Sequence, residues 1–180
     1  MPSEENKALQ SVLAPLMKAH GYRKSGATWH GVSSAFIRVL NIQGSQFGKY
    51  FFINLGIFIR ALGENPKPKE YDCHVRQRLS GLVSDGGDVF AVLDFQNDMP
   101  WGEREQALRN LVQDHALPWL EKKSDIEEIR NYLTREKLHG LPVGKEVYDY
   151  LGIDRGEAEQ SLRLVRKNAA RARHSCAGQG

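Results

Sequence analysis

The chain has 180 residues, of which 41% are hydrophobic and 26% charged, and its formal net charge is +3. This length and composition predict one folded domain of ordinary size and exclude a disordered chain. The charge is too small to indicate nucleic-acid binding by itself, so nucleic acid is not expected as a partner.

Cysteine usage and hydropathy predict the cellular location of the protein. Cys73 and Cys176 are two isolated thiols and do not form a disulfide framework. The first residues, MPSEENK, are acidic and polar, unlike a secretory signal peptide. The longest apolar run, Tyr50 to Ile59, is too short to cross a membrane. We therefore expect a cytoplasmic protein without a membrane partner.

The first half of the chain predicts a helix followed by strands. Apolar residues from Leu9 to Met17 recur at helical spacing, with Ser3 as the N-cap and Gly21 as the stop. Strands are expected at 28–30, 35–43 and 50–60, and the loop GSQFGK joins the last two as a hairpin. Two further strands are expected in YDCHVRQRL (71–79) and VFAVLDF (89–95), separated by the turn SDGGD.

From Trp101 onward the apolar spacing is helical. Pro118 is expected to end the first of these helices. A capping-box pattern at Ser124 and Glu127 predicts the next helix, and Pro142 is expected to open another that ends near Gly152. A second capping box, Asp154 and Glu157, predicts a last helix. Its apolar stripe consists of Ala158, Leu162, Val165 and Ala169.

This order of one helix, about five antiparallel strands and three to four helices is typical of an α+β fold. We expect an α+β domain over residues 1–120. A helical C-terminal extension over residues 121–180 is expected to pack on it and form one globular unit.

The strand at 50–60 has one plain face and one mixed face, because side chains alternate along a strand. Its odd positions, from Phe51 to Ile59, are all apolar, whereas the even ones include Asn54. If Leu40 and Ile42 of the preceding strand lie on the apolar side, five side chains meet on the other: Asn41, Gln43, Tyr50, Phe52 and Asn54. A slip of one residue in the hairpin would undo this alignment.

The mixed face predicts one of two structures. Aromatic rings with a few amides, including the nearby Ser45, are typical of a groove that binds a polar ligand. Alternatively, the amides satisfy a loop or helix of the same chain that crosses the sheet.

A second polar cluster lies in DCHVRQRL. Alternation places Cys73, Val75 and Leu79 on one face; on the other it places Asp72, His74, Arg76 and Arg78. Adjacent cations repel unless an anion lies opposite. That anion is either a bound phosphate or carboxylate, or an internal acid among Glu64, Glu70, Asp85, Asp88 and Asp94.

The sequence predicts no catalytic residue, metal site or cofactor. Cys73 and His74 are strand neighbours that point to opposite faces, so they should not form a thiolate pair. The histidines lack metal-ligand spacing, and the phosphate-loop, dinucleotide and nucleophile-elbow motifs are absent. The basic tail from Arg163 to Arg173 is typical of a solvated helix end; the alternative is contact with nucleic acid or an acidic partner.

Three motifs together resemble a bacterial family catalogued as domain of unknown function 4304. They are GYRKSGATW after the first helix, the long motif NIQGSQFGKYFFINLGI, and CHVRQRL, and the likeness covers about residues 9 to 80. The resemblance implies a small, soluble bacterial α+β protein and no particular reaction, cofactor or partner. Gln77 stands where that family often has glycine, which argues against a close backbone approach at that point.

These observations favour a non-catalytic module that binds a polar or anionic ligand or a protein segment. By analogy alone, such a small binding module fits an immunity or antitoxin role. Its expected binding residues are Asn41, Gln43, Ser45, Tyr50, Asn54, His74, Arg76 and Arg78. The alternative is an enzyme acting on a phosphate-containing or nucleotide-like small molecule, with His74 as general acid or base. A third hypothesis is assembly through the C-terminal apolar stripe, and a monomer or weak homo-oligomer is expected.

Overall fold

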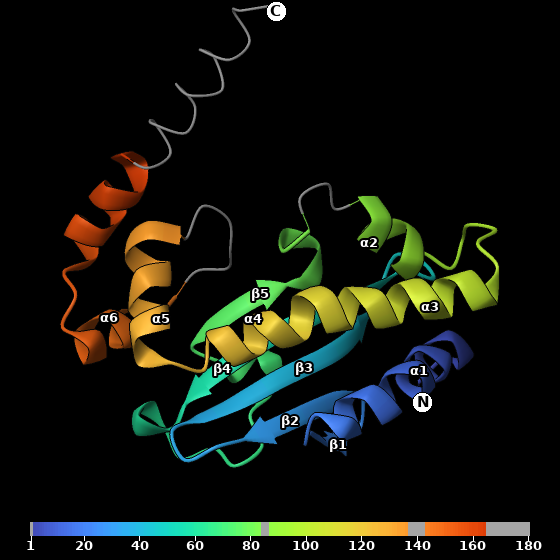
Figure 1. The fold of residues 1–180 in the computed structure, drawn as a ribbon, viewed down its shortest axis with the longest axis horizontal. Helices are drawn as coiled ribbons and strands as arrows, with labels where there is room; N and C mark the ends of the chain where they lie inside the picture. The colour runs from blue at the N-terminus through green and yellow to red at the C-terminus, as the bar shows by residue number, and fades with distance from the viewer. Residues whose placement is uncertain (1, 84–86, 137–142, 165–180) are drawn as a thin grey trace, which may run out of the picture.

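The computed structural model describes residues 2–83, 87–136 and 143–164. Its centre is a five-stranded sheet in which each strand pairs antiparallel with the next along the chain (Figure 1). The strands are β1 (Arg23–Ser25), β2 (Thr28–Val32), β3 (Phe36–Gly44), β4 (Phe51–Ile59) and β5 (Val75–Arg78). With one helix before the sheet and several after it, the predicted α+β fold is confirmed.

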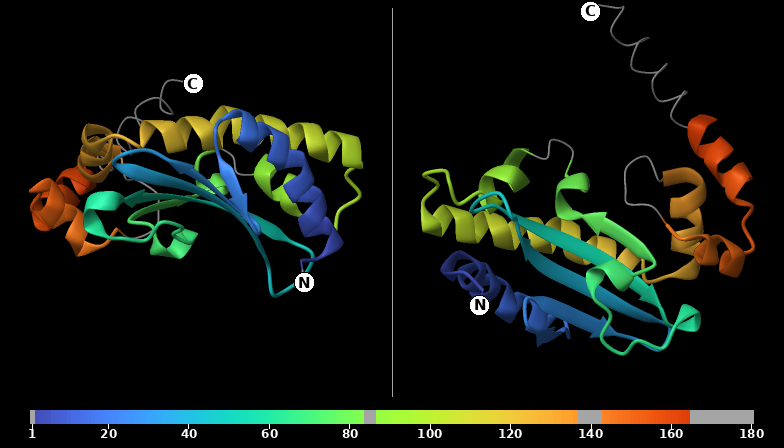
Figure 2. Two further views of the ribbon diagram at one scale, coloured as in Figure 1. Left: turned by 90° about the horizontal axis from the view of Figure 1, so that it is seen from below. Right: turned by 180° about the vertical axis from the view of Figure 1, so that it is seen from behind.

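Three α-helices cover one face of the sheet. Seen from below in Figure 2, α1 (Glu4–Ala19), α3 (Trp101–Leu111) and α4 (Leu117–Lys122) lie on one side, and the segment between β4 and β5 lies on the other. The helix-covered face carries the odd positions of β4, and Ile53, Leu55 and Ile57 are at most 2% exposed. The predicted apolar face is therefore the core face. Ser3 caps α1 as expected, since its Oγ accepts from the backbone N–H of Asn6.

Pro118 does not end the helix that contains it, so that prediction is wrong. The helix runs through a π-helical turn, η4 (Val112–Ala116), directly into α4. Proline has no N–H to donate to the preceding turn, and it is tolerated at the first positions of α4. The result is a long rod of α3, η4 and α4 across the sheet (Figure 1).

The predicted strand at 89–95 is also wrong, because this segment forms α2 (Gly87–Leu93). Its buried residues Val89, Val92 and Leu93 have the spacing of a helical face. The fifth strand is instead β1, which was not predicted from the sequence. It is short, and its Ser25 pairs with Thr28 around a tight turn at Gly26, whose φ is 62°.

Beyond the rod, α5 (Ile126–Asn131), the π-helix η5 (Tyr132–Glu136), α6 (Lys145–Leu151) and a helical segment at 155–164 follow. Asp125, rather than Ser124, caps α5 by accepting from Glu128 N at 2.9 Å. Asp154 accepts from Glu157 N, as predicted. Both Ala158 and Leu162 are buried within the chain. The described residues exclude Ser84 to Gly86, Pro142, Val165, Ala169, Cys176 and the basic tail beyond Leu164.

One buried apolar cluster connects α1, the core face of the sheet, the rod and residues of the C-terminal helices such as Ile129, Val147 and Ala158. Gln77 of β5 is buried on this side, where its amide donates to the carbonyl of Gly81 at 3.5 Å. Within the described ranges, no helix has the length and apolar character needed to span a membrane.

Candidate functional site

The hairpin between β3 and β4 has the register that brings the amides together. Asn41 lies opposite Asn54 and Gln43 opposite Phe52, while Leu40 faces Leu55 on the core side. The predicted register is therefore confirmed. The plain and mixed faces of β4 follow directly from it.

The same register builds a continuous polar row across the whole sheet. Each member is the direct cross-strand partner of the next, and together the five are Ser25, Thr28, Asn41, Asn54 and Arg78. Direct partners project from the same face. Four strand spacings of about 4.8 Å make this polar row roughly 19 Å long. No apolar residue interrupts it.

A crossing segment covers the neighbouring part of this face. It comprises η1 (Arg60–Leu62), the loop after it and η2 (Glu70–Asp72). Under it, a small apolar cluster forms from Ile37, Val39, Phe58 and Cys73. His30 of β2 hydrogen-bonds the carbonyl of Pro68 through Nε2 at 2.9 Å, which fixes the segment to the sheet.

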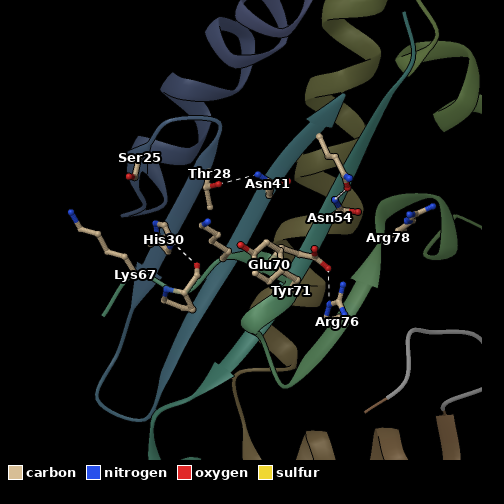
Figure 3. A pocket seen from close by; sticks show the side chains of 13 residues that line it. Ser25, Thr28, His30, Asn41, Asn54, Lys67, Glu70, Tyr71, Arg76 and Arg78 are labelled. Carbon is tan, nitrogen blue, oxygen red and sulfur yellow. Dashed lines mark hydrogen bonds and ion pairs between the residues drawn. The ribbon is translucent and has the colours of Figure 1, made fainter. Parts of the chain in front are cut away.

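Between the crossing segment and β5 lies a pocket of about 650 Å³, whose floor is the polar row (Figure 3). This volume falls within the range of about 300–1,000 Å³ that is usual for small-molecule sites. Its lining residues are Ser25, Thr28, His30, Asn41, Gln43, Asn54, Lys67, Pro68, Lys69, Glu70, Tyr71, Arg76 and Arg78. The mixed face therefore carries a crossing segment of the same chain and, beside it, an open pocket.

The amides of the pocket floor are held in place but keep hydrogen-bonding capacity. Asn54 is only 2% exposed, and its Nδ2 donates to Oε1 of Gln43 at 2.8 Å. Asn41 donates to Oγ1 of Thr28 at 2.9 Å. No hydrogen bond to Oδ1 of Asn54 exists within the described residues, although buried amides are usually satisfied. This acceptor is therefore available to a bound molecule.

The pocket walls are basic. Lys67 and Lys69 come from the crossing segment, and Arg76 and Arg78 from β5, whereas Glu70 is the one acidic residue in the lining. Nε of Arg76 pairs with Oε1 of Glu70 at 2.8 Å, and Glu70 is largely buried. Thus one of the internal acids considered from the sequence does pair with one of the two strand arginines.

Arg78 differs from Arg76, because no carboxylate of the described residues pairs with it. Its guanidinium lies over the ring of Phe52, 4.5 Å from the centroid. Stacking leaves the N–H groups at the edge of the guanidinium able to bind an anion in a bidentate manner.

His74 does not join the two arginines in the pocket. Its Nδ1 accepts from the backbone N–H of Ile59 at 2.9 Å, and its ring packs against Phe58. Burial lowers the pKa of the imidazole. The predicted pairing of Cys73 with Val75 on one face is also wrong, since Cys73 packs on the mixed face. Both differences arise because β5 begins only at Val75, after a 3-10 turn.

Ser45 and Tyr50 also lie outside the pocket lining. Ser45 belongs to the hairpin loop, where its Oγ accepts from Phe47 N. Tyr50 packs edge-on against Phe52 and stacks with Phe90. Burial raises the pKa of the Tyr50 phenol. The structure thus brings together Asn41, Gln43, Asn54, Arg76 and Arg78 out of the eight predicted residues.

The described residues show no second chemical centre. Burial raises the pKa of the Cys73 thiol far above its usual value, which keeps it protonated and unreactive. Among the residues placed in the structure, no three histidine, cysteine or acidic side chains are grouped as metal ligands would be.

Several pocket residues were not predicted from the sequence. Thr28 and Ser25 could have been found from the register alone, because they extend the row from Asn41. Lys67, Lys69 and Tyr71 could not, because their positions depend on the path of the crossing segment. The only signal they gave was the run of basic and proline residues in ENPKPKE.

Comparison with known proteins gives one family. The family model described as "Domain of unknown function (DUF4304)" matches residues 13–122, which include all five strands and the whole pocket lining. Neither the curated proteins nor the solved structures contained a match. The match covers more than half of the chain and agrees with the resemblance of its motifs, so the chain belongs to this family of domains of unknown function.

Proposed function

We propose that this chain is a non-catalytic binding module that takes a small polar anion into the pocket over its polar row. The observation that supports this most directly is Asn54, an almost fully buried amide with an unused acceptor at the floor of a basic pocket. Core packing does not require an amide there. Positioned polar groups in a concave site are what fixes the orientation of a ligand.

The charges of the pocket favour an anion over a neutral ligand. Four cationic side chains face one carboxylate, and that carboxylate is already paired with Arg76. A bound anion would relieve the repulsion between Arg76 and Arg78, which are two residues apart on the same face of β5.

An enzyme acting on a phosphate-containing small molecule is the alternative, and the position of His74 does not favour it. A general base needs a free lone pair within reach of the substrate. Nδ1 of His74 is occupied by a backbone N–H, and His74 does not line the pocket. We further propose a cytoplasmic bacterial setting and, by analogy alone, an immunity-like role, for which a toxin gene beside its own would be the evidence.

The test is ligand-induced stabilisation. The melting temperature of the wild type is measured with phosphate, sulfate, citrate and nucleotides, and isothermal titration calorimetry is done on any anion that raises it. Binding stabilises the folded state by mass action, so a ligand at 100 times its Kd adds roughly 2.7 kcal/mol. Arg78→Ala should remove most of this shift.

The matched control is Arg109→Ala. Arg109 pairs with Glu105 at 2.8 Å on the surface of α3, outside the pocket. Its removal deletes one arginine without touching the pocket, so the shift should persist. If no anion stabilises the wild type, or if both variants respond equally, the proposal is wrong.

A further inference from the structure

We infer that the ligand class is a nucleoside phosphate, with its phosphate at Arg76 and Arg78 and its base against Tyr71. This inference rests on the proposed function and makes it specific. Three features of the pocket carry it: a pair of arginines, an exposed aromatic ring, and a floor of amides (Figure 3).

The cationic end is suited to a phosphate. Arg76 and Arg78 project from the same face of β5 and lie about 7 Å apart along the strand. Arg78 has no carboxylate partner among the described residues, and Arg76 uses only Nε on Glu70. Their remaining N–H groups can converge on the oxygens of one phosphate, which guanidinium groups bind in a bidentate manner.

The second feature is an aromatic ring in the pocket lining that is largely exposed to solvent. Tyr71 is 62% exposed, although it follows directly after the buried Glu70. Lys69 lies over the Tyr71 ring, with Nζ 5.4 Å from the centroid. An exposed aromatic next to basic side chains is the arrangement on which nucleobases stack.

The floor offers both donors and acceptors to the polar edge of a base. Oδ1 of Asn54 is an acceptor without a partner in the described chain, and Asn41 and Gln43 contribute further carboxamide groups beside it. Carboxamides recognise bases because they donate and accept in the same plane. A simple inorganic anion would leave this row unused.

The dimensions also match. From Thr28 to Arg78 the polar row crosses three strand spacings, or about 14 Å. A pocket of about 650 Å³ has room for a base, a sugar and a phosphate at once. The row is too long for phosphate alone.

The test is calorimetric titration of the wild type with the four nucleoside monophosphates, the four corresponding nucleosides, ribose 5-phosphate and inorganic phosphate. At least one nucleotide should bind more than about tenfold tighter than ribose 5-phosphate and than its own nucleoside. Tyr71→Ala should weaken that nucleotide by about 5- to 150-fold and leave ribose 5-phosphate unchanged. Tyr71→Phe keeps the ring and should bind as the wild type does.

Tyr150→Ala is the control for loss of an exposed tyrosine, since Tyr150 lies on α6 outside the pocket. Equal binding of ribose 5-phosphate and nucleotide, or full affinity in Tyr71→Ala, overturns the inference but leaves the proposed anion module intact. Failure of every anion overturns both. Tighter binding of a short single-stranded RNA than of any mononucleotide would also overturn it, in favour of a nucleic-acid surface.

Discussion

Cys73 sits directly on Gly56. A Cβ added at Gly56 would lie 2.6 Å from Sγ and 2.7 Å from Cβ of Cys73. The absence of a side chain at Gly56 therefore lets Cys73, the residue directly after the crossing segment, pack against β4. The pocket wall formed by that segment depends on this approach.

Gly56→Ala should lower the free energy of unfolding by about 1–3 kcal/mol, because a buried overlap must be relieved by moving backbone. Chemical denaturation measures this directly. Gly102→Ala is the control: an added Cβ on α3 meets nothing within 4 Å, so stability should hold or rise slightly. Adding Cys73→Gly to Gly56→Ala should recover part of the loss, and a loss that stays the same would disprove the steric explanation.

The Glu70–Arg76 pair should be worth more than an ordinary surface pair. Both of its side chains are at least 70% buried, unlike those of Glu105 and Arg109, although both pairs are 2.8 Å long. A double-mutant cycle to Gln and Ala should give a coupling of about 1–2 kcal/mol for Glu70–Arg76, against about 0.3–0.5 for the helical pair. Equal couplings would mean that burial adds nothing here.

Glu70→Gln should also affect binding. Removing the only carboxylate of the pocket lining raises its positive potential, so anion affinity should increase at low salt. Titrations at two salt concentrations test this, since the gain should shrink as screening increases. Weaker binding in this variant would show that Glu70 positions Arg76 for the ligand.

His74 should make stability depend on pH. Burial lowers its pKa in the folded state, so the unfolded chain takes up the proton first as the pH falls. The contribution of neutral His74 to the free energy of unfolding is fully present above about pH 6.5. It decreases below that pH until the pKa of His74 in the folded state is reached. The difference in unfolding free energy between the wild type and His74→Gln should therefore change between pH 7.5 and 5. Parallel profiles would contradict this.

The ion pair of Glu5 and Lys49 ties α1 to the β3–β4 hairpin, with an Nζ–Oε1 distance of 2.8 Å. The hydrogen bond from Lys49 lowers the pKa of Glu5 from 4.5 to about 2. The contribution of the Glu5–Lys49 ion pair to stability is present above pH 4.5 and is lost as the pH falls toward 2. In Lys49→Ala, an NMR titration of the Glu5 carboxyl should give a higher pKa, still below the usual value because hydrogen bonds from the backbone and Ser3 remain. Lys18→Ala, which removes a lysine of α1 outside this ion pair, should leave the pKa of Glu5 low.

The faces of the central hairpin were predictable because one face of β4 is wholly apolar. A slip of one residue would turn Asn41 toward the aliphatic side of Ile53 and Leu55, where burying an unpaired amide is costly, so alternation excludes odd slips. The same alternation would have extended the polar row to Thr28, had the short β2–β3 pairing been followed. Local physics alone therefore places most of the pocket floor.

The walls of the pocket were not predictable, because they depend on contacts between distant segments. The position of Lys69 and Tyr71 follows from the approach of Cys73 to Gly56 and from the bond between His30 and Pro68. His74 was misplaced for a related reason: the 3-10 turn before it breaks the alternation expected of a strand. The apolar run in α2 was short enough to fit a strand or a buried helix equally well.

The polar row runs at right angles to the strands. A change of length in the GSQFGK loop can therefore leave the fold intact and still break the ligand site. A shift of β4 by two residues along β3 would keep every side chain on its own face, so a folded sheet would survive. Asn54 would nevertheless leave the line between Asn41 and Arg78, and the row would be cut in the middle. The hairpin loop thus sets the alignment of a site that it never touches, and family members with loops of other lengths need not share its ligand.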